Sequence, residues 1–268
     1  MFKKTSLFSL LFYVGITAQT MLSAETNPFV SKFPLKEGII HYVIRGNISG
    51  EKILYFKNYG KEQLIVTKRN SGILDLNKMK KSITLIQQGE KYTINLENNS
   101  IRKEKLLTTA LYQKFKKLTQ QDQKLLLKKI QQLPNRSYQN LNSNCILHAK
   151  KIAGFWCNEE QIDGKTECST AHGALLLDST INILGYHVKE FATNIEAKEL
   201  NPALFEIPKD LAITSGSMDI DKKAETIIHY LLHTDNLLSC QPRRADATPK
   251  EELHQLMYNE IQNLSKNF

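Results

Sequence analysis

Alternating apolar and polar residues divide the segment from residue 39 to residue 96 into short strand-like runs. Aromatic and β-branched residues dominate these runs, and residues of these types favour strands. Turn-forming sequences such as Asn58-Tyr59-Gly60-Lys61 and Gly89-Glu90 separate them. The pattern predicts an antiparallel meander whose strands cover 39–45, 52–57, 63–68, 83–86 and 92–96.

Between residues 106 and 133 the apolar period changes to that of a helix. Leu107, Leu111, Phe115 and Leu118 recur every three or four residues, the stripe continues to residue 130, and Pro134 ends it. Lysine and glutamine occupy the positions between. The sequence therefore predicts one amphipathic helix over 106–133, inserted between two halves of a sheet.

The strand pattern returns after a polar loop and then gives way to helical periodicity. Strand-like runs cover 155–157, 166–168, 174–181 and 186–195, and an apolar stretch at 202–208 closes this half. A linker at Thr214–Ser217 precedes helical patterns at 219–240 and from residue 248 onward. We therefore expect an antiparallel β-rich domain over 25–212 and a helical tail over 213–268.

The first residues have the features of a secretory signal peptide. Lys3 and Lys4 precede a short apolar run at 7–16, and the small residue Ala24 comes before Asn27-Pro28. The alternative, a membrane anchor, is disfavoured because the run is too short to cross about 30 Å of hydrocarbon as a helix. We predict cleavage after residue 24 and a periplasmic location, with no stable membrane span in the remaining chain.

The chain carries a formal net charge of +9, and much of the excess lies in residues 101–132. In that segment nine Lys or Arg residues face only Glu104 and Asp122. A basic helix can attract phosphate, anionic lipid or nucleic acid, or it can simply present a solvated face. The solvated face is the favoured interpretation, and export argues against a nucleic-acid partner.

Four cysteines in an exported chain predict disulfide bonds, because the periplasm is oxidising. Cys157 and Cys168 flank Asp163-Gly164, and Asp-Gly between two extended runs is typical of a hairpin turn. The hairpin would bring these two cysteines together, so we predict that they are bonded. Cys145 with Cys240 then follows by exclusion.

The order of several short motifs resembles that of uncharacterised bacterial periplasmic proteins. The resemblance covers about residues 36–210 and rests on Gly38-Ile39-Ile40-x-Tyr42, Ser49-Gly50-Glu51, Tyr59-Gly60, His172-Gly173-Ala174-Leu175-Leu176, Ala192-Thr193-Asn194-Ile195 and Phe205-Glu206-Ile207-Pro208. In those proteins two meander halves form a curved sheet similar to the lipoprotein-carrier (LolA/LolB-like) half-barrel. The resemblance implies an α+β fold with a curved, half-barrel-like antiparallel sheet, which we expect the amphipathic helix to cover.

Few residues in the sequence have the types and spacing of a catalytic or metal-binding site. Cys168 and His172 would lie about 13 Å apart along a strand, too far for direct proton transfer. His229 and His233 are four residues apart on a helix, but the glutamate of the metalloprotease motif is missing, and a pair of surface histidines is the favoured interpretation. A concave ligand face could be lined by aromatic residues of the first meander, although core packing is their commoner role; they are Tyr42, Tyr55, Phe56, Tyr59 and Tyr92. We predict no catalytic site, no metal site and no cofactor.

These features leave two functional hypotheses, with an enzyme third. In the first, a non-catalytic carrier binds an apolar or lipid-like ligand between sheet and helix, and Phe115, Leu118 and Leu125 contact it. Such a cleft would suit an acyl chain. In the second, the sheet core is filled and the helices bind a protein partner of the cell envelope. An empty cavity distinguishes the carrier from the scaffold.

Overall fold

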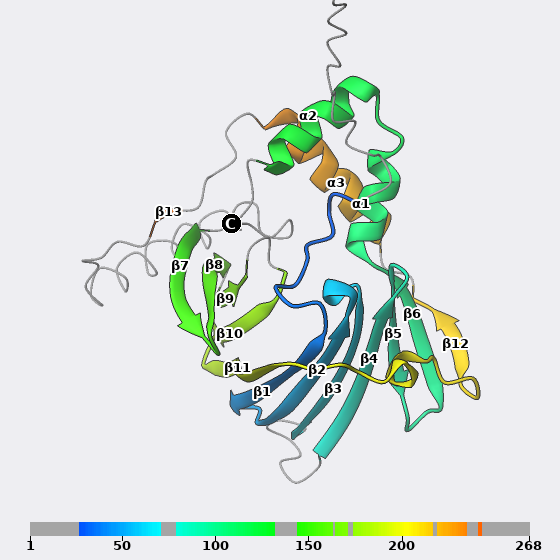
Figure 1. Ribbon diagram of the computed structural model, residues 1–268, viewed down its shortest axis with the longest axis vertical. Coiled ribbons are helices and arrows are strands. Elements are labelled where there is room, and N and C mark those ends of the chain that lie inside the picture. The colour runs from blue at the N-terminus through cyan, green and yellow to red at the C-terminus, as the bar shows by residue number, and fades with distance from the viewer. Residues whose placement is uncertain are drawn as a thin grey trace, which may run out of the picture.

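The strands of the computed structural model form an open, curved and mostly antiparallel sheet, with helices gathered at one end (Figure 1). The structure describes residues 27–70, 79–131, 144–162, 164–170, 174–216, 219–234 and 241–242 of the 268-residue chain. Thirteen strands within these ranges belong to one sheet. This arrangement confirms the predicted α+β class and the curved antiparallel sheet.

The first half of the sheet is a regular meander in which each strand pairs antiparallel with the next. Strongly β-forming residues with turn residues between them explain this regularity. The strands are β1 (Gly38–Gly46), β2 (Gly50–Lys57), β3 (Glu62–Asn70), β4 (Met79–Gln87), β5 (Glu90–Asn95) and β6 (Ser100–Lys105).

The second half is another meander, and its last strand, β11, pairs antiparallel with β1 to join the halves. It comprises β7 (Asn144–Ile152), β8 (Phe155–Ile162), β9 (Lys165–Ser169), β10 (Leu176–Ile183) and β11 (Tyr186–Ala197). Short strands pair in parallel at the two outer edges: β12 (Ala212–Ser215) with β6, and β13 (Gln241–Pro242) with β7.

The sheet has an apolar cluster on each face, because successive side chains of a strand point to opposite sides. Ile40 belongs to a cluster with the buried cysteines of β8 and β9, whereas its neighbour Ile39 belongs to a cluster on β4–β6. Leu200 and Phe205 complete the second cluster. The apolar stretch at 202–208 starts with a 3₁₀ turn, Pro202–Phe205, and crosses the sheet toward β12 (Figure 1).

The expected single helix over 106–133 is two helices. They are α1 (Leu107–Phe115) and α2 (Gln120–Gln131). The backbone N–H of Asp122 donates to Thr119 Oγ1 at 3.2 Å, and the Thr119 hydroxyl donates to the Asp122 carboxylate. Thr-x-x-Asp is a start signal for a new helix, so the chain turns here although the apolar spacing continues.

The apolar stripe of these helices faces other helices, which corrects the expectation that it covers the sheet. Leu111, Phe115 and Leu126 are buried together with Ile228 and Leu231 of α3 (Ile220–His233). Phe29 joins them, with its ring 6.0 Å from that of Phe115. An apolar stripe shows which side of a helix is buried but not which element buries it.

Ion pairs and hydrogen bonds of lysine side chains hold α3 against β6, α1 and α2. Lys105 and Lys114 form ion pairs with Asp221 and Glu225 of α3 at 3.0 and 2.6 Å. The ammonium of buried Lys129 donates to the carbonyl oxygens of Leu232 and Thr234, both at 2.9 Å, at the end of α3. Some lysines of the basic segment over residues 101–132 therefore form contacts inside the protein.

The segment around the predicted boundary between the β-rich domain and the helical tail contacts the rest of the protein. The linker expected at 214–217 begins within β12, and α3 packs on α1 and α2. The predicted signal peptide over 1–24 and the helix expected from residue 248 lie outside the described residues. Among the residues that are described, no helix is long and apolar enough to cross a membrane.

Candidate functional site

A cleft of about 980 Å³ lies where the N-terminal segment, the end of the first meander and α1 meet. We call it the α1 cleft. Residues within 27–33, 58–63, 86–89 and 106–111 line it, together with Ala174. Its volume is at the upper end of the roughly 300–1,000 Å³ typical of small-molecule sites.

One wall of the α1 cleft is a strained turn between β2 and β3. Asn58, Tyr59 and Gly60 all have left-handed backbone conformations, with φ of 51°, 57° and 83°. Left-handed φ is uncommon for a bulky residue such as tyrosine. The Phe33 ring lies directly on Gly60, and the backbone N–H of Phe33 donates to the Tyr59 carbonyl at 2.9 Å. The absence of a side chain at residue 60 thus lets the N-terminal segment close onto this turn.

A second wall is the hairpin between β4 and β5. Gln88 and Gly89 have φ of 52° and 78°, as a two-residue type I′ turn requires. The carbonyl of Gly89 accepts hydrogen bonds from the Leu106 N–H at 3.0 Å and the Thr109 hydroxyl at 2.8 Å. These bonds hold the start of α1 against the hairpin.

The lining changes from exposed and polar to buried and apolar. Lys32, Tyr59 and Lys61 are exposed, whereas Phe29 and Leu111 are buried. The Lys32 ammonium lies 6.0 Å from the centre of the Tyr59 ring. A polar rim over an apolar base is the usual arrangement of a site for an organic ligand.

The residues predicted to contact ligand lie elsewhere on the helices. Phe115 is buried in the helical cluster, Leu118 packs against that cluster, and the side chain of Leu125 is 40% exposed. None of them lines the α1 cleft. Their contact with a ligand stays a prediction. The sequence predicts turns at Asn58-Tyr59-Gly60-Lys61 and Gly89-Glu90, but it gives no signal that these turns meet the N-terminal segment and α1 to form the cleft.

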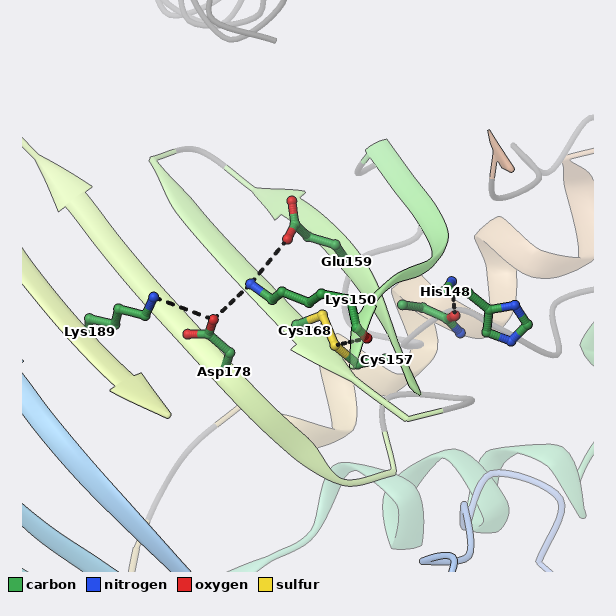
Figure 2. The surroundings of a disulfide bond; sticks show 8 residues. His148, Lys150, Cys157, Glu159, Cys168, Asp178 and Lys189 are labelled. Carbon is green, nitrogen blue, oxygen red and sulfur yellow. Dashed lines mark hydrogen bonds and ion pairs between the residues drawn. A yellow bond between two sulfur atoms is a disulfide. The ribbon is translucent and has the colours of Figure 1, made fainter. Parts of the chain in front are cut away.

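The predicted Cys157–Cys168 disulfide is confirmed. It joins β8 to β9, and both cysteines are buried (Figure 2). Cys168 is therefore not a free thiol, which removes it as a nucleophile. Cys145 is also disulfide-bonded, but its expected partner, Cys240, lies outside the described residues.

A group of charged residues surrounds this disulfide. In Figure 2 the side chains of Lys150 and Lys189 point toward the buried Asp178, and Glu159 contacts Lys150. Burial acts to lower the pKa of Lys150, but the hydrogen bonds and charges of Asp178 and Glu159 outweigh it and raise that pKa. Asp178 Oδ1 has no hydrogen-bond partner among the described residues. None of these residues lines the α1 cleft.

The structure brings no metal-ligand set together within the residues it describes. His229 and His233 do lie on one face of α3, with ring centres 4.1 Å apart. His233 Nδ1 lies 2.8 Å from the carbonyl oxygen of His229, a contact within the helix. Both side chains are exposed, consistent with surface histidines.

The aromatic residues considered as ligand contacts divide between core and cleft. Tyr42, Phe56 and Tyr92 are buried, and the Tyr42 hydroxyl donates to the Leu176 carbonyl at 2.9 Å. Tyr55 packs against the cluster on β4–β6. Of this set only Tyr59 lines the α1 cleft.

Comparison with known proteins gives only distant likenesses. No protein-family model matches the sequence, and no curated protein matches it. An uncharacterized conserved protein from Thermus thermophilus is similar over 68% of this chain and 91% of its own, with 9% identity and a TM-score of 0.41. PNGF-II is similar over 73% of this chain and 33% of its own, with 11% identity and a TM-score of 0.35. LprF from Mycobacterium bovis is similar over 62% of this chain and 89% of its own, with 12% identity and a TM-score of 0.26. TM-scores this low assign neither a family nor a function.

Proposed function

We propose that the protein is an exported, non-catalytic binding protein of the bacterial periplasm, which holds a lipid-like ligand in the α1 cleft. The observation that carries the proposal is the cleft itself, with its volume of about 980 Å³ and its apolar base. The Cys157–Cys168 disulfide supports export, because such bonds persist in oxidising compartments.

The cleft is built to keep its shape without a ligand. Hydrogen bonds from Leu106 and Thr109 to Gly89 hold one wall, and the contact of Phe33 with Gly60 holds another. A site formed in advance loses less conformational freedom on binding. This favours a binding role over a chance gap between elements.

A second candidate function is a scaffold that binds a protein partner in the cell envelope. The observation that favours it is the packing on both faces of the sheet, where buried side chains form an apolar cluster on each face. A ligand between sheet and helix, as in a half-barrel carrier, would need that space. In our proposal the ligand therefore binds beside the sheet, at the α1 cleft.

The test combines native mass spectrometry of protein purified from the periplasm with titration of a fluorescent fatty-acid probe. We expect co-purified lipid and saturable probe binding. Ile86→Gln places an amide in the cleft lining and should weaken probe binding by about tenfold, the effect of losing roughly one buried apolar contact.

The matched control is Ile183→Gln, the same change at an exposed isoleucine outside the cleft, which should leave probe affinity unchanged. Urea midpoints of both variants show whether each is folded. Absence of lipid and of probe binding in the unaltered protein would reject the carrier and leave the scaffold.

A further inference from the structure

Two lysines at the rim of the α1 cleft form no ion pair with the residues that the structure describes. Lys32 and Lys61 are both exposed and both line the cleft. Among the described residues neither ammonium has a carboxylate partner, although twelve ion pairs elsewhere in that part of the chain engage other lysines and arginines. Lys32 instead lies over the ring of Tyr59.

Among the described residues, one carboxylate lines the cleft, that of Glu62. Glu62 is the first residue of β3 and accepts a hydrogen bond from the side-chain amide of Asn58 in the preceding turn. The rim therefore holds two ammonium groups against one carboxylate. Its local charge is positive, and it lies at the solvent side of the cleft.

The buried residues of the cleft lining are apolar. Phe29 and Leu111 are buried in the helical cluster, and Leu107 packs against that cluster from the first turn of α1. Ile86 adds an apolar contact from β4. Charge at the rim and apolar surface at the base match a molecule that has an acidic group at one end and a hydrocarbon chain at the other.

We propose that the ligand of the α1 cleft is an anionic amphiphile, whose carboxylate or phosphate group lies between Lys32 and Lys61 while its chain packs on Leu107 and Ile86. This inference rests on the proposed binding function and adds the chemical class of the ligand. Charged hydrogen bonds from ammonium groups to such oxygens are stronger than neutral ones, so they give preference for the anion.

The experiment measures dissociation constants at pH 8 for dodecyl phosphate, dodecanoate and the neutral monododecanoylglycerol, by displacement of a neutral fluorescent probe. We expect the two anions to bind about tenfold more tightly than the neutral compound, as two partly exposed ion pairs would give. Raising the salt concentration should reduce that preference, because exposed charges are screened.

The deciding variant is Lys32→Gln combined with Lys61→Gln, in which all three compounds should bind with affinities within about twofold of one another. The matched control is Lys151→Gln combined with Lys223→Gln, which removes the same charge from exposed positions outside the cleft. The control should keep the preference.

The possible failures are distinguishable. Equal binding of anionic and neutral compounds by the unaltered protein would overturn this inference and leave the proposed function standing. A preference that survives in the Lys32/Lys61 variant would also overturn it. Inorganic phosphate binding as tightly as dodecyl phosphate would reject an amphiphile. Failure of every compound and of the probe itself would reject the proposed function.

Discussion

Lys150 Nζ lies 2.7 Å from Asp178 Oδ2, and this ion pair connects β7 to β10 across the two strands between them. The Asp178 side chain is 6% exposed. Removing the cation would leave this carboxylate, among the residues that the structure describes, with only the more distant Lys189, at 3.8 Å. We expect Lys150→Met to lower the free energy of unfolding by about 2–3 kcal/mol, somewhat less than for a fully buried pair.

Urea denaturation measures this difference. The control is Lys151→Met, which changes the exposed neighbour of Lys150 on the same strand and should have an effect within about 0.5 kcal/mol. Equal midpoints for the two variants would show that the pair contributes nothing.

Tyr42 should make the protein less stable in alkali. Burial, assisted by the negative charge of Glu190, raises the pKa of its hydroxyl above the ordinary value of 10.0. Above pH 10 the unfolded chain loses this proton while the folded chain keeps it, so stability is complete below the unfolded pKa and declines above it. The decline due to this group should approach about 1.4 kcal/mol per pH unit.

Tyr42→Phe isolates this contribution. The variant loses the hydrogen bond to Leu176, worth about 1 kcal/mol at neutral pH. Its stability should then fall less steeply than that of the unaltered protein between pH 10 and pH 11.5. Parallel curves from urea midpoints over that range would contradict the assignment.

Gly60 should tolerate alanine poorly. A Cβ atom there would lie 2.6 Å from the Phe33 ring, and φ is +83°. Gly154→Ala is a matched control, since Gly154 has φ of +90° and no atom within 4 Å of the added carbon. We expect a loss of about 1 kcal/mol for the control, from backbone strain alone, and about 2–3 kcal/mol for Gly60→Ala. Equal losses in thermal unfolding would show that Phe33 moves aside freely.

Variants at two adjacent leucines of α2 test core packing and ligand contact separately. Leu126 is fully buried, whereas Leu125 is 40% exposed. Leu126→Ala should lower the free energy of unfolding by about 2–4 kcal/mol and Leu125→Ala by under about 0.5 kcal/mol. If Leu125 contacts a ligand as the sequence predicts, its variant should weaken probe binding without changing the urea midpoint. Unchanged probe binding would remove Leu125 from the site.

Most of the strands and one disulfide could be predicted from the sequence because their causes are local, whereas β6 (Ser100–Lys105) and β7 (Asn144–Ile152) were not predicted. Alternation of apolar residues with turns at Gly60 and Gly89 defines the first meander, and Asp163-Gly164 defines the hairpin that brings Cys157 near Cys168. The break at Thr119 also has a local signal, in Thr119-x-x-Asp122. Because the apolar spacing continues without a break over residues 106–133, the sequence pattern predicted one helix despite this signal.

The α1 cleft could not be predicted because its walls meet only after folding. Phe33, Gly60, Gly89 and Thr109 lie in four separate segments of the chain, and the turn sequences at Gly60 and Gly89 indicate only where strands end. Similarly, the apolar stripe of α1 gives no information about α3, which buries it. Periodicity describes one element at a time, whereas a cleft depends on how several elements pack.

The pairing of β1 with β11 constrains the order in which the sheet can form. Gly38 pairs with Ala197, so the central pair joins segments from opposite halves of the chain. A chain that emerges from its N-terminus can form β1–β3 early, but β1 then has an unpaired edge until β11 arrives. Such an edge can pair with strands of other chains, and long-range pairing is slow. Folding should therefore be slow and prone to aggregation, and a chaperone that shields β1 should raise the yield.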